Sequence, residues 1–393
     1  MLERVLKGSP KFYAWIVFLL SIIGYAFIVY VFQLNFGLKQ TGLSRNVSWG
    51  FYIAQFTYLV GVAAAAVMLV LPAYFHHYVK FKRVIVFAEF LAIGAVIMCM
   101  LFILVDLGQP QRVMNVILHP TPNSIMFWDM CVLCGYLLLN CVIGWTTLEC
   151  ERYHVQPPNW TRYLAYLSII WAFSIHTVTA FLYAGLPGRH YWLSAIMAAR
   201  FLASAFCSGP AILLLLLILL KKLTSFDPGK SVIKNLSLII TYAMCLNVFF
   251  FLLEVFTAFY SGIPGHAHPF HFLFGSEGWL GPWMWVAVVC ALLSVFLLVV
   301  PQFRTNMKIL PFALIILVIA SWIDKGLGLL IGGFMPTPYE TIEIYTPTFW
   351  EVSVALGVFA VGALVISLLW KIALDVLKEA GEFPLPEEEV SAI

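Results

Sequence analysis

Charged side chains are scarce in this sequence. They make up 10% of the 393 residues, while hydrophobic residues make up 62%. An ordinary soluble domain carries about 25% charged residues, so this composition excludes a water-soluble globule and predicts a chain that lies in a lipid bilayer. The net charge is only +3 and no run of six like charges occurs, so the sequence lacks the basic surface with which proteins bind nucleic acid.

Linkers rich in glycine, proline or serine are also missing. We therefore expect one polytopic membrane domain over residues 1–378, followed by an acidic, solvated cytoplasmic tail at 379–393. The eight cysteines all fall in or at the edges of apolar stretches, which indicates buried apolar side chains rather than a disulfide framework. Cys131 and Cys134 have the spacing of a metal or redox pair, but no second pair accompanies them.

Ten apolar stretches are each long enough to cross the hydrocarbon core of a bilayer as a helix. They cover residues 12–32, 51–74, 84–106, 124–148, 163–184, 195–220, 236–260, 281–300, 307–330 and 349–373. The predicted fold class is an all-α integral membrane protein with about ten transmembrane helices in a bundle. The first stretch is long enough to span, and no small-residue cleavage pattern follows it, so we expect it to remain in the mature protein.

Lysine and arginine are distributed unequally between the loops. With the amino terminus placed inside, sixteen fall at the inner ends of the spans and only four fall outside, namely Lys39, Arg45, Arg112 and Arg189. The positive-inside rule therefore predicts that both termini are cytoplasmic.

Ionisable residues at membrane depth are costly and are kept mainly for function. With the predicted orientation, those in the outer half are Asp106, Asp129, His176, Arg200, Glu254, Asp324, Lys325 and Glu351. We expect a polar cavity that opens toward the outer leaflet, in which the two cations balance some of the carboxylates; pairing between helices alone is the alternative. Glu89 lies toward the cytoplasm, where it either reaches the headgroups or begins an inner proton path.

Histidine pairs that could ligate a membrane haem are absent, because only His176 lies well inside a span. No haem b is therefore expected. The outer-loop run with His266, His268 and His271 has no carboxylate or cysteine beside it to complete a familiar metal site, so no metal is expected in this chain either.

The outer stretch after the third span reads DLGQPQRVMNVILHPTPNSIMFWDM, residues 106–130. It resembles the NrfD family, the polysulfide-reductase membrane subunits, in which an Asp-Leu-Gly-x-Pro-x-Arg element precedes a Ser-x-Met-x-Trp helix start. The stretches 174–215 and 324–351 are similar to the His-bearing helix pair and the late outer loop of the ten-helix branch of that family. Within the branch, the likeness is closest to the DsrP and HmcC type subunits of sulfate-reducer transmembrane redox complexes.

The resemblance implies a haem-free subunit of a respiratory complex in a prokaryotic cytoplasmic membrane. Such a subunit binds a quinone, menaquinone or menaquinol, near the outer leaflet and exchanges electrons with an extracytoplasmic four-cluster iron–sulfur protein. A multihaem cytochrome c and further membrane or cytoplasmic redox subunits are implied as partners, and sulfur metabolism as the setting. The chain is then either non-catalytic by itself or the quinone-reactive part of a larger oxidoreductase.

Matching positions in the motifs nominate site residues. The resemblance implies that Asp106 and Arg112 form an ion pair that brackets the quinone loop, with a helix cap and loop brace as the alternative. It also implies that His176 is a proton or quinone ligand. The stretch WGFYIAQFTYLVG, residues 49–61, resembles the family's early helix that faces the quinone and nominates Gln55 and Tyr58.

Membrane depth nominates the remaining residues of the site. Quinone chemistry moves two protons with two electrons, so proton acceptors are needed beside the ring. We expect catalytic roles for His176, Asp106, Glu254 and Asp324, quinone binding by Gln55, Tyr58, Arg112, His176, Arg200 and Lys325, and a proton path through Glu89, Glu254 and Asp324.

Two other classes of function stay open. A secondary transporter would suit a ten-span bundle with buried charges. The motif at 106–112 and an expected absence of paired broken helices favour the redox subunit instead. A structural membrane anchor without a quinone site of its own is the third hypothesis.

Overall fold

Within the described residues, ten helices are long and apolar enough to cross a membrane. The structure is a computed structural model, and it describes residues 3–4, 7–63, 65–75, 81–186, 188–276, 278–339 and 341–381. Over these residues the chain is almost entirely helical and has no strand. The predicted class, an all-α multi-pass membrane protein, is confirmed.

Each predicted stretch overlaps one of these spans. The first five spans are α1 (Pro10–Phe36), α2 with α3 (Phe51–Ala63 and Val67–Phe75), α4 (Lys82–Asp106), α6 (Ile125–Tyr153) and α7 (Asn159–Ala184). The next three are α8 (Met197–Leu223), α9 (Lys230–Tyr260) and α11 (Gly281–Val299). The ninth joins α13 (Ile309–Ser321), η5 (Trp322–Gly328) and α14 (Leu329–Gly333), and the tenth is α15 (Phe349–Glu379).

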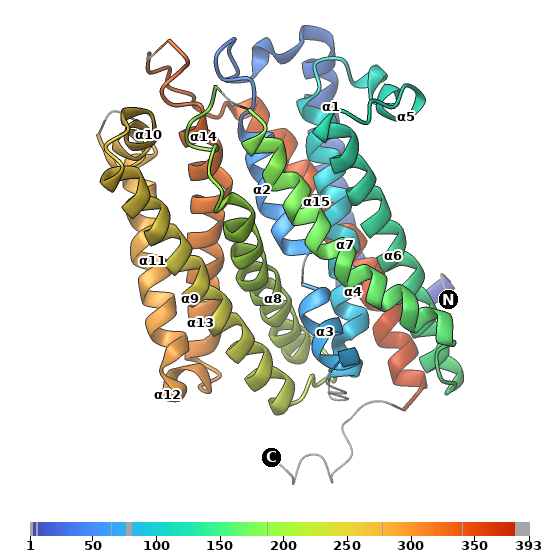
Figure 1. Cartoon of the computed structure of the whole chain (residues 1–393). Helices are drawn as coiled ribbons and strands as arrows, with labels where there is room; N and C mark the ends of the chain where they lie inside the picture. Colours follow the sequence, from blue (N-terminus) through green and yellow to red (C-terminus); the bar gives the residue numbers. More distant parts are fainter. Residues whose placement is uncertain are drawn as a thin grey trace.

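Short helices cap the bundle. Those in the described loops are η2 (Leu38–Gln40), η4 (Pro110–Arg112), α5 (Asn115–Leu118), α10 (Pro264–Phe274) and α12 (Pro301–Arg304). The spans themselves run roughly side by side, with the connecting segments at the two ends of the bundle (Figure 1). This arrangement satisfies the backbone polar groups inside each helix, as a bilayer requires.

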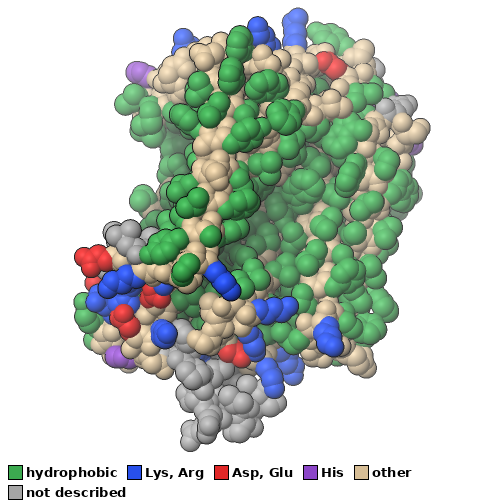
Figure 2. All heavy atoms as spheres, turned by 180° about the vertical axis from the view of Figure 1, so that it is seen from behind, with side chains coloured by type: hydrophobic (Ala, Val, Ile, Leu, Met, Phe, Trp, Pro, Cys, Tyr) green, Lys and Arg blue, Asp and Glu red, His purple; other side chains and the backbone are tan. Residues whose placement is uncertain are grey.

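The second and fourth helices form the centre of the bundle. In the most apolar 18-residue stretch of each span, 94% of the residues are buried in the second span and 83% in α4, whereas only 17% are buried in α1. The outermost helix, α1, packs mainly on α15. A space-filling view from behind shows an apolar surface between two ends that carry the basic side chains (Figure 2). Such a surface fits a hydrocarbon environment.

Both ends of the described chain lie on the same side of the bundle (Figure 1). Arg4 Nη2 donates to Glu379 Oε2 over 2.5 Å, which joins the amino-terminal segment to the end of α15. The cytoplasmic position of this side rests on the charge distribution and stays a prediction. Glu379 still belongs to α15, and residues 382–393 of the predicted tail lie outside the described residues.

Glu351 was expected to belong to an outer polar cavity, and this expectation is wrong. The residue is fully buried in the first turn of α15, where it forms a capping box with Thr348. Its carboxylate accepts hydrogen bonds from the Gly42 N–H at 2.9 Å and the Tyr345 hydroxyl at 2.5 Å. Burial and the adjacent carboxylate raise the pKa of the Tyr345 hydroxyl, which keeps it a donor. Glu351 therefore braces the outer loops.

Candidate functional site

Two irregular spans lie side by side at the centre of the bundle. In the second span, α2 ends at Ala63 and α3 begins at Val67, and residues 65 and 66 form a turn between them. The ninth span contains the π-helical segment η5. Each of these spans still counts as one membrane-crossing helix, Phe51–Pro72 and Ile309–Gly333, so the expected absence of paired broken helices stays a prediction. Residues 63–66 are all alanine, the best helix former, so nothing in the local sequence indicates the turn.

Glycine allows the neighbouring helices to approach this interruption closely. A Cβ atom added to Gly209 of α8 would lie 2.9 Å from the Gly61 carbonyl oxygen and 3.0 Å from the Ala65 nitrogen. A Cβ atom on Gly326 of η5 would lie 3.2 Å from the Ala54 carbonyl oxygen. Since α8 and η5 contact the backbone of α2 directly, protein rather than lipid covers the interrupted segment, as membrane depth requires.

Three of the nominated charges form one buried cluster. Arg200 of α8 donates from Nη2 to both carboxylate oxygens of Asp324 at 3.0 Å, and from Nη1 to Glu254 of α9. The Arg200 side chain is only 6% exposed, and its guanidinium also lies 5.4 Å from the centre of the Phe251 ring. Planar, paired contacts of this kind are how arginine holds two carboxylates away from water. The predicted balancing of carboxylates by Arg200 is found in the structure.

Lys325, the second predicted counter-charge, is not paired in this way. Its side chain is buried, and no carboxylate of the described residues lies within ion-pair distance of Nζ. Instead, Nζ donates to the Phe201 carbonyl oxygen at 3.3 Å and lies 4.6 Å from the centre of the Phe201 ring. A buried lysine at membrane depth without a paired carboxylate has a high energetic cost, which marks Lys325 as a functional candidate.

The outer polar cavity expected from the sequence is not open in the described residues. The space bounded by Arg200, Asp324, Lys325 and Asn247 measures about 10 Å³, which is about the room needed for one water molecule. The side chains of α8, α9 and η5 pack against one another and close the space that the sequence left open. Pairing between helices accounts for Arg200, Glu254 and Asp324.

An apolar groove of about 390 Å³ lies on the other side of η5, between α2, α13 and α15. Gln55 and Tyr58 of α2 lie at its floor with Trp322 of η5. Its remaining walls are Phe51, Val318, Ile319, Val352, Ala355, Leu356 and Phe359. Leu356 is 56% exposed and Ile319 39% exposed, so the groove opens to the bilayer. The apolar flank seen from behind is hollowed between two ridges of hydrophobic side chains (Figure 2).

The surface of this groove is wholly apolar, but two of the side chains that line it carry buried polar atoms that are only partly satisfied. Trp322 Nε1 donates to Gln55 Oε1 over 2.8 Å, which fixes the amide. Gln55 Nε2 and the Tyr58 hydroxyl are buried and have no hydrogen-bond partner among the described residues. Buried donors without partners are rare and costly, so a polar group from outside the chain fits here. Trp322 was not nominated as a site residue from the sequence. Its position, two residues before the nominated Asp324, could have indicated it.

A second, smaller hollow of about 100 Å³ lies between α9, α11 and α13. Its rim includes Leu252 and Leu292, which are more than half exposed, and its polar lining includes Asn247 and Asp324. The two hollows therefore flank η5, and Asp324 lies at the wall of the second one. Lipid has access to η5 from two directions.

The predicted ion pair between Asp106 and Arg112 is not formed. Arg112 is exposed in η4, and its guanidinium makes no ion pair with a described residue. Asp106 ends α4, and its Oδ1 atom is buried without a hydrogen-bond partner in the described part of the chain. The intervening turn at 107–109 leads the chain outward, so the two charges separate.

His176 and Asp129 do not line the groove: Asp129 lies at the packing between α6 and α7, whereas His176 of α7 lies toward α8, with its ring centre 6.5 Å from that of Phe206. His176 is fully buried, and neither ring nitrogen has a hydrogen-bond partner among the described residues. Asp129 is 4% exposed and accepts a hydrogen bond of 2.6 Å from the Thr179 hydroxyl, as the alternative of pairing between helices predicts.

Glu89 is buried in α4 and does not reach the headgroups. It is 2% exposed, and its Oε2 atom has no hydrogen-bond partner in the described residues. A Cβ atom on Gly144 of α6 would lie 3.0 Å from that oxygen. On the same stretch of α6, the Tyr136 hydroxyl donates to the Ala63 carbonyl oxygen, at 3.2 Å, where α2 is interrupted. Of the two predicted alternatives, snorkelling is wrong.

Comparisons with a family model and with known proteins point to the same family. The family model "Polysulphide reductase, NrfD" matches residues 39–338. The chain is 25% identical to a putative dimethyl sulfoxide reductase membrane subunit of Halobacterium salinarum, over 88% of this chain and 87% of the relative. It is 22% identical to the Hdr-like menaquinol oxidoreductase integral membrane subunit of Archaeoglobus fulgidus, over 92% of this chain and 93% of the relative.

A third relative is the menaquinone reductase, integral membrane subunit, of Nitratidesulfovibrio vulgaris, which is 25% identical over 92% of this chain and 91% of its own length. These matches cover most of each relative, so the whole ten-span bundle is shared rather than one segment. Since the family model alone spans about three quarters of the chain, including the interrupted second span and η5, this protein belongs to the polysulphide reductase NrfD family.

Proposed function

We propose that this chain is the quinone-interacting membrane subunit of a respiratory redox complex in a prokaryotic cytoplasmic membrane. It exchanges electrons between menaquinol or menaquinone, near the outer leaflet, and an extracytoplasmic iron–sulfur protein. The names of the relatives from Archaeoglobus fulgidus and Nitratidesulfovibrio vulgaris, a menaquinol oxidoreductase subunit and a menaquinone reductase subunit, support this substrate class.

The groove between α2, α13 and α15 carries the proposal. A quinone needs an apolar slot for its isoprenoid tail and hydrogen-bond donors for its ring oxygens. The walls of the groove are apolar and open to lipid, and two of the side chains that line it, Gln55 and Tyr58, carry the unpartnered Nε2 and hydroxyl, which lie buried behind its apolar surface. Trp322 engages Gln55 Oε1 and leaves the amide nitrogen as the free donor. A ring in the groove would satisfy both atoms.

Proton transfer is the second requirement of the proposal. A bound quinol supplies two electrons and two protons when it is oxidised. Tyr58 is the residue that holds or moves a proton at the floor of the groove. On η5, Asp324 and Lys325 lie two and three residues after Trp322, and Arg200 and Glu254 extend the charged cluster. We assign to them the route away from the groove.

The remaining nominated residues have other places in the proposal. Glu89, buried beside the interruption of the second span, is the inner member of the proton route. Asp106 and His176 each carry a buried polar atom without a partner among the described residues, and we assign them to positioning water or protons at the outer side. Arg112, exposed on η4, lies outside the groove.

A secondary transporter is the second candidate function. Helices interrupted at the centre of a bundle, beside buried charges, are a feature of transporters, and the second span and η5 have that character. The transporter hypothesis requires uptake of a solute by the chain itself. The redox hypothesis requires a quinone and a partner that accepts electrons.

The test measures quinone binding by the full chain, purified with its accompanying subunits into nanodiscs. Menaquinone-4 is titrated into wild type, Tyr58→Phe and Gln55→Leu. Each variant removes one hydrogen bond, so affinity falls by about tenfold. Tyr242→Phe is the matched control, because Tyr242 is 66% exposed on α9 and does not line the groove. Its affinity stays at the wild-type value.

Three other outcomes would contradict the proposal in distinguishable ways. Unchanged affinity in both groove variants, with tight binding in wild type, would place the quinone elsewhere. No binding by an intact assembly would favour the anchor. Solute uptake by proteoliposomes that contain this chain without redox subunits would favour the transporter.

A further inference from the structure

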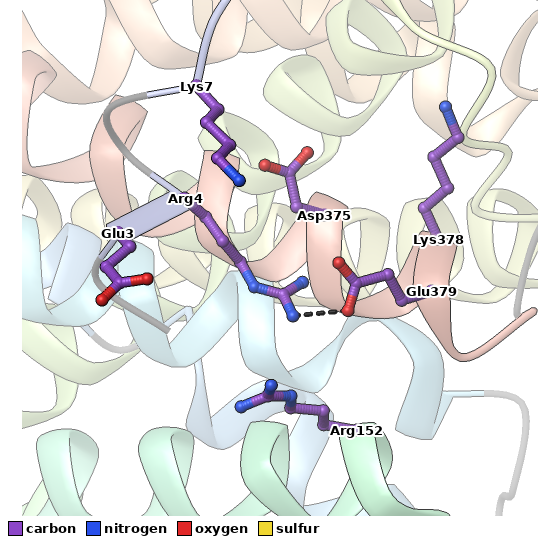
Figure 3. Close-up of a pocket in the computed structure, with 7 residues that line it drawn as sticks. All are labelled: Glu3, Arg4, Lys7, Arg152, Asp375, Lys378 and Glu379. Carbon is purple, nitrogen blue, oxygen red and sulfur yellow. Dashed lines mark hydrogen bonds and ion pairs between the residues drawn. The ribbon is translucent and has the colours of Figure 1, made fainter.

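A pocket of about 330 Å³ lies at the end of the bundle that carries both termini. It is lined by Glu3, Arg4, Lys7, Arg152, Asp375, Lys378 and Glu379. Three segments that are far apart in sequence meet there, namely the residues before α1, the end of α6 and the end of α15 (Figure 3). Its size falls in the range of small-molecule sites.

The charges of this pocket do not cancel. Arg4 pairs with Glu379 at 2.5 Å, and Asp375 pairs with Lys371 at 2.5 Å. Among the described residues, three lining cations, Lys7, Arg152 and Lys378, have no ion-pair partner, against one unpaired carboxylate, Glu3, so an excess of positive charge remains. The guanidinium groups of Arg4 and Arg152 approach the same space from different segments (Figure 3).

Arg4 supplies a second, independent observation. Its Nη2 atom is engaged by Glu379, but its Nη1 atom is buried and has no hydrogen-bond partner among the described residues. A guanidinium nitrogen that is removed from water and left without an acceptor is costly, and an anionic oxygen is the acceptor that suits it.

We propose that this pocket binds the phosphate group of an anionic phospholipid, with the phosphodiester held by Arg4, Lys7 and Arg152. Basic pockets between transmembrane helices on the cytoplasmic side are suited to anionic headgroups. The pocket lies where α1 begins and α15 ends, which is the depth of the headgroups. Close by in sequence, Tyr13 and Trp15 of α1 are 44% and 42% exposed, as interfacial aromatic residues are.

Such a lipid would join the three segments that form the pocket. Of the described residues before α1, Arg4 is joined to the bundle by its pair with Glu379, whose side chain is 61% exposed. Exposed ion pairs contribute little to stability. A bound phosphate that contacts Arg4, Lys7 and Arg152 together would therefore be the stronger link between the amino terminus, α6 and α15.

The test uses the full chain in its native assembly, delipidated in a neutral detergent. Dioleoylphosphatidylglycerol, dioleoylphosphatidylcholine and inorganic phosphate are titrated separately, and bound lipid and the thermal unfolding midpoint are measured. The variant Lys7→Gln/Arg152→Gln removes two pocket cations. The control Lys222→Gln/Lys234→Gln removes two exposed cations of α8 and α9 that do not line the pocket.

We expect wild type and the control to bind phosphatidylglycerol alike, and the pocket variant to bind it about 25-fold more weakly, at roughly fivefold for each cation lost. Phosphatidylcholine should raise the unfolding midpoint little. If inorganic phosphate binds as tightly as phosphatidylglycerol and is lost in the pocket variant, the site takes a soluble phosphate and the phosphate chemistry stands.

Equal lipid affinity in the pocket variant and wild type would overturn the proposal. Equal weakening in the pocket and control variants would also overturn it, because attraction of lipid to the whole basic end would then explain the binding. Both variants change exposed side chains and keep the Arg4–Glu379 pair, so their unfolding midpoints without lipid should match wild type.

Discussion

Arg200 is the residue whose replacement should damage the bundle most. Its side chain is 6% exposed and holds Glu254, which is 7% exposed, and Asp324, which is 18% exposed. Arg200→Met leaves both carboxylates without their cation at membrane depth. Removing one partner of a buried ion pair costs about 3–5 kcal/mol. Because Asp324 is partly exposed and the lost pair is partly screened, we expect the lower end, about 3 kcal/mol.

The assay is the equilibrium unfolding of the purified chain by sodium dodecyl sulfate in mixed micelles, followed by tryptophan fluorescence. The matched control is Arg200→Met/Glu254→Gln/Asp324→Asn, which removes all three charges. Replacing a whole buried ion cluster by neutral groups is often nearly neutral, so the triple variant should recover most of the lost stability. A triple variant no more stable than Arg200→Met would refute the explanation by unpaired charge.

Three further predictions concern packing, capping and the groove. Gly209→Ala should destabilise the chain by about 1–3 kcal/mol, because backbone atoms of the interrupted span leave no room for a methyl group; Gly24→Ala, in open space, should not, and equal unfolding curves would contradict this packing. Thr348→Ala should cost about 1 kcal/mol by removing the α15 capping box, whereas Thr348→Ser should retain most of it; an unchanged alanine variant would show that the cap is unimportant. Trp322→Phe should weaken menaquinone-4 binding, since Gln55 loses the donor that orients it. Unchanged affinity would show that the Trp322–Gln55 hydrogen bond does not contribute to binding.

The spans were predictable from the sequence because hydrocarbon thickness fixes their length and the lipid face must be apolar. The irregularities inside them were not. Four consecutive alanines at 63–66 favour a continuous helix, and the π-helical segment η5 depends on contacts with α2 and α8 that lie far away in sequence. Packing between helices decided both features.

The candidate site shows the same division. Gln55 and Tyr58 were nominated together and do share one groove, since they lie three residues apart on α2. The bond that completes the floor joins positions 267 residues apart and had no local signature. The Asp106–Arg112 pair was predicted wrongly because a loop motif fixes residue types but not the path of the chain. The sequence Thr-x-x-Glu at 348–351 is a recognisable capping box, but Glu351 was interpreted only as a charge at membrane depth.

The most direct test of the central claim is a density map of the purified assembly with menaquinone and native lipids. A planar ring in the groove, with its oxygens within hydrogen-bond distance of Gln55 Nε2 and the Tyr58 hydroxyl and its tail leaving past α13 and α15, is the result that we predict. A groove filled only by acyl chains, with the ring elsewhere or no ring in the chain, would contradict it.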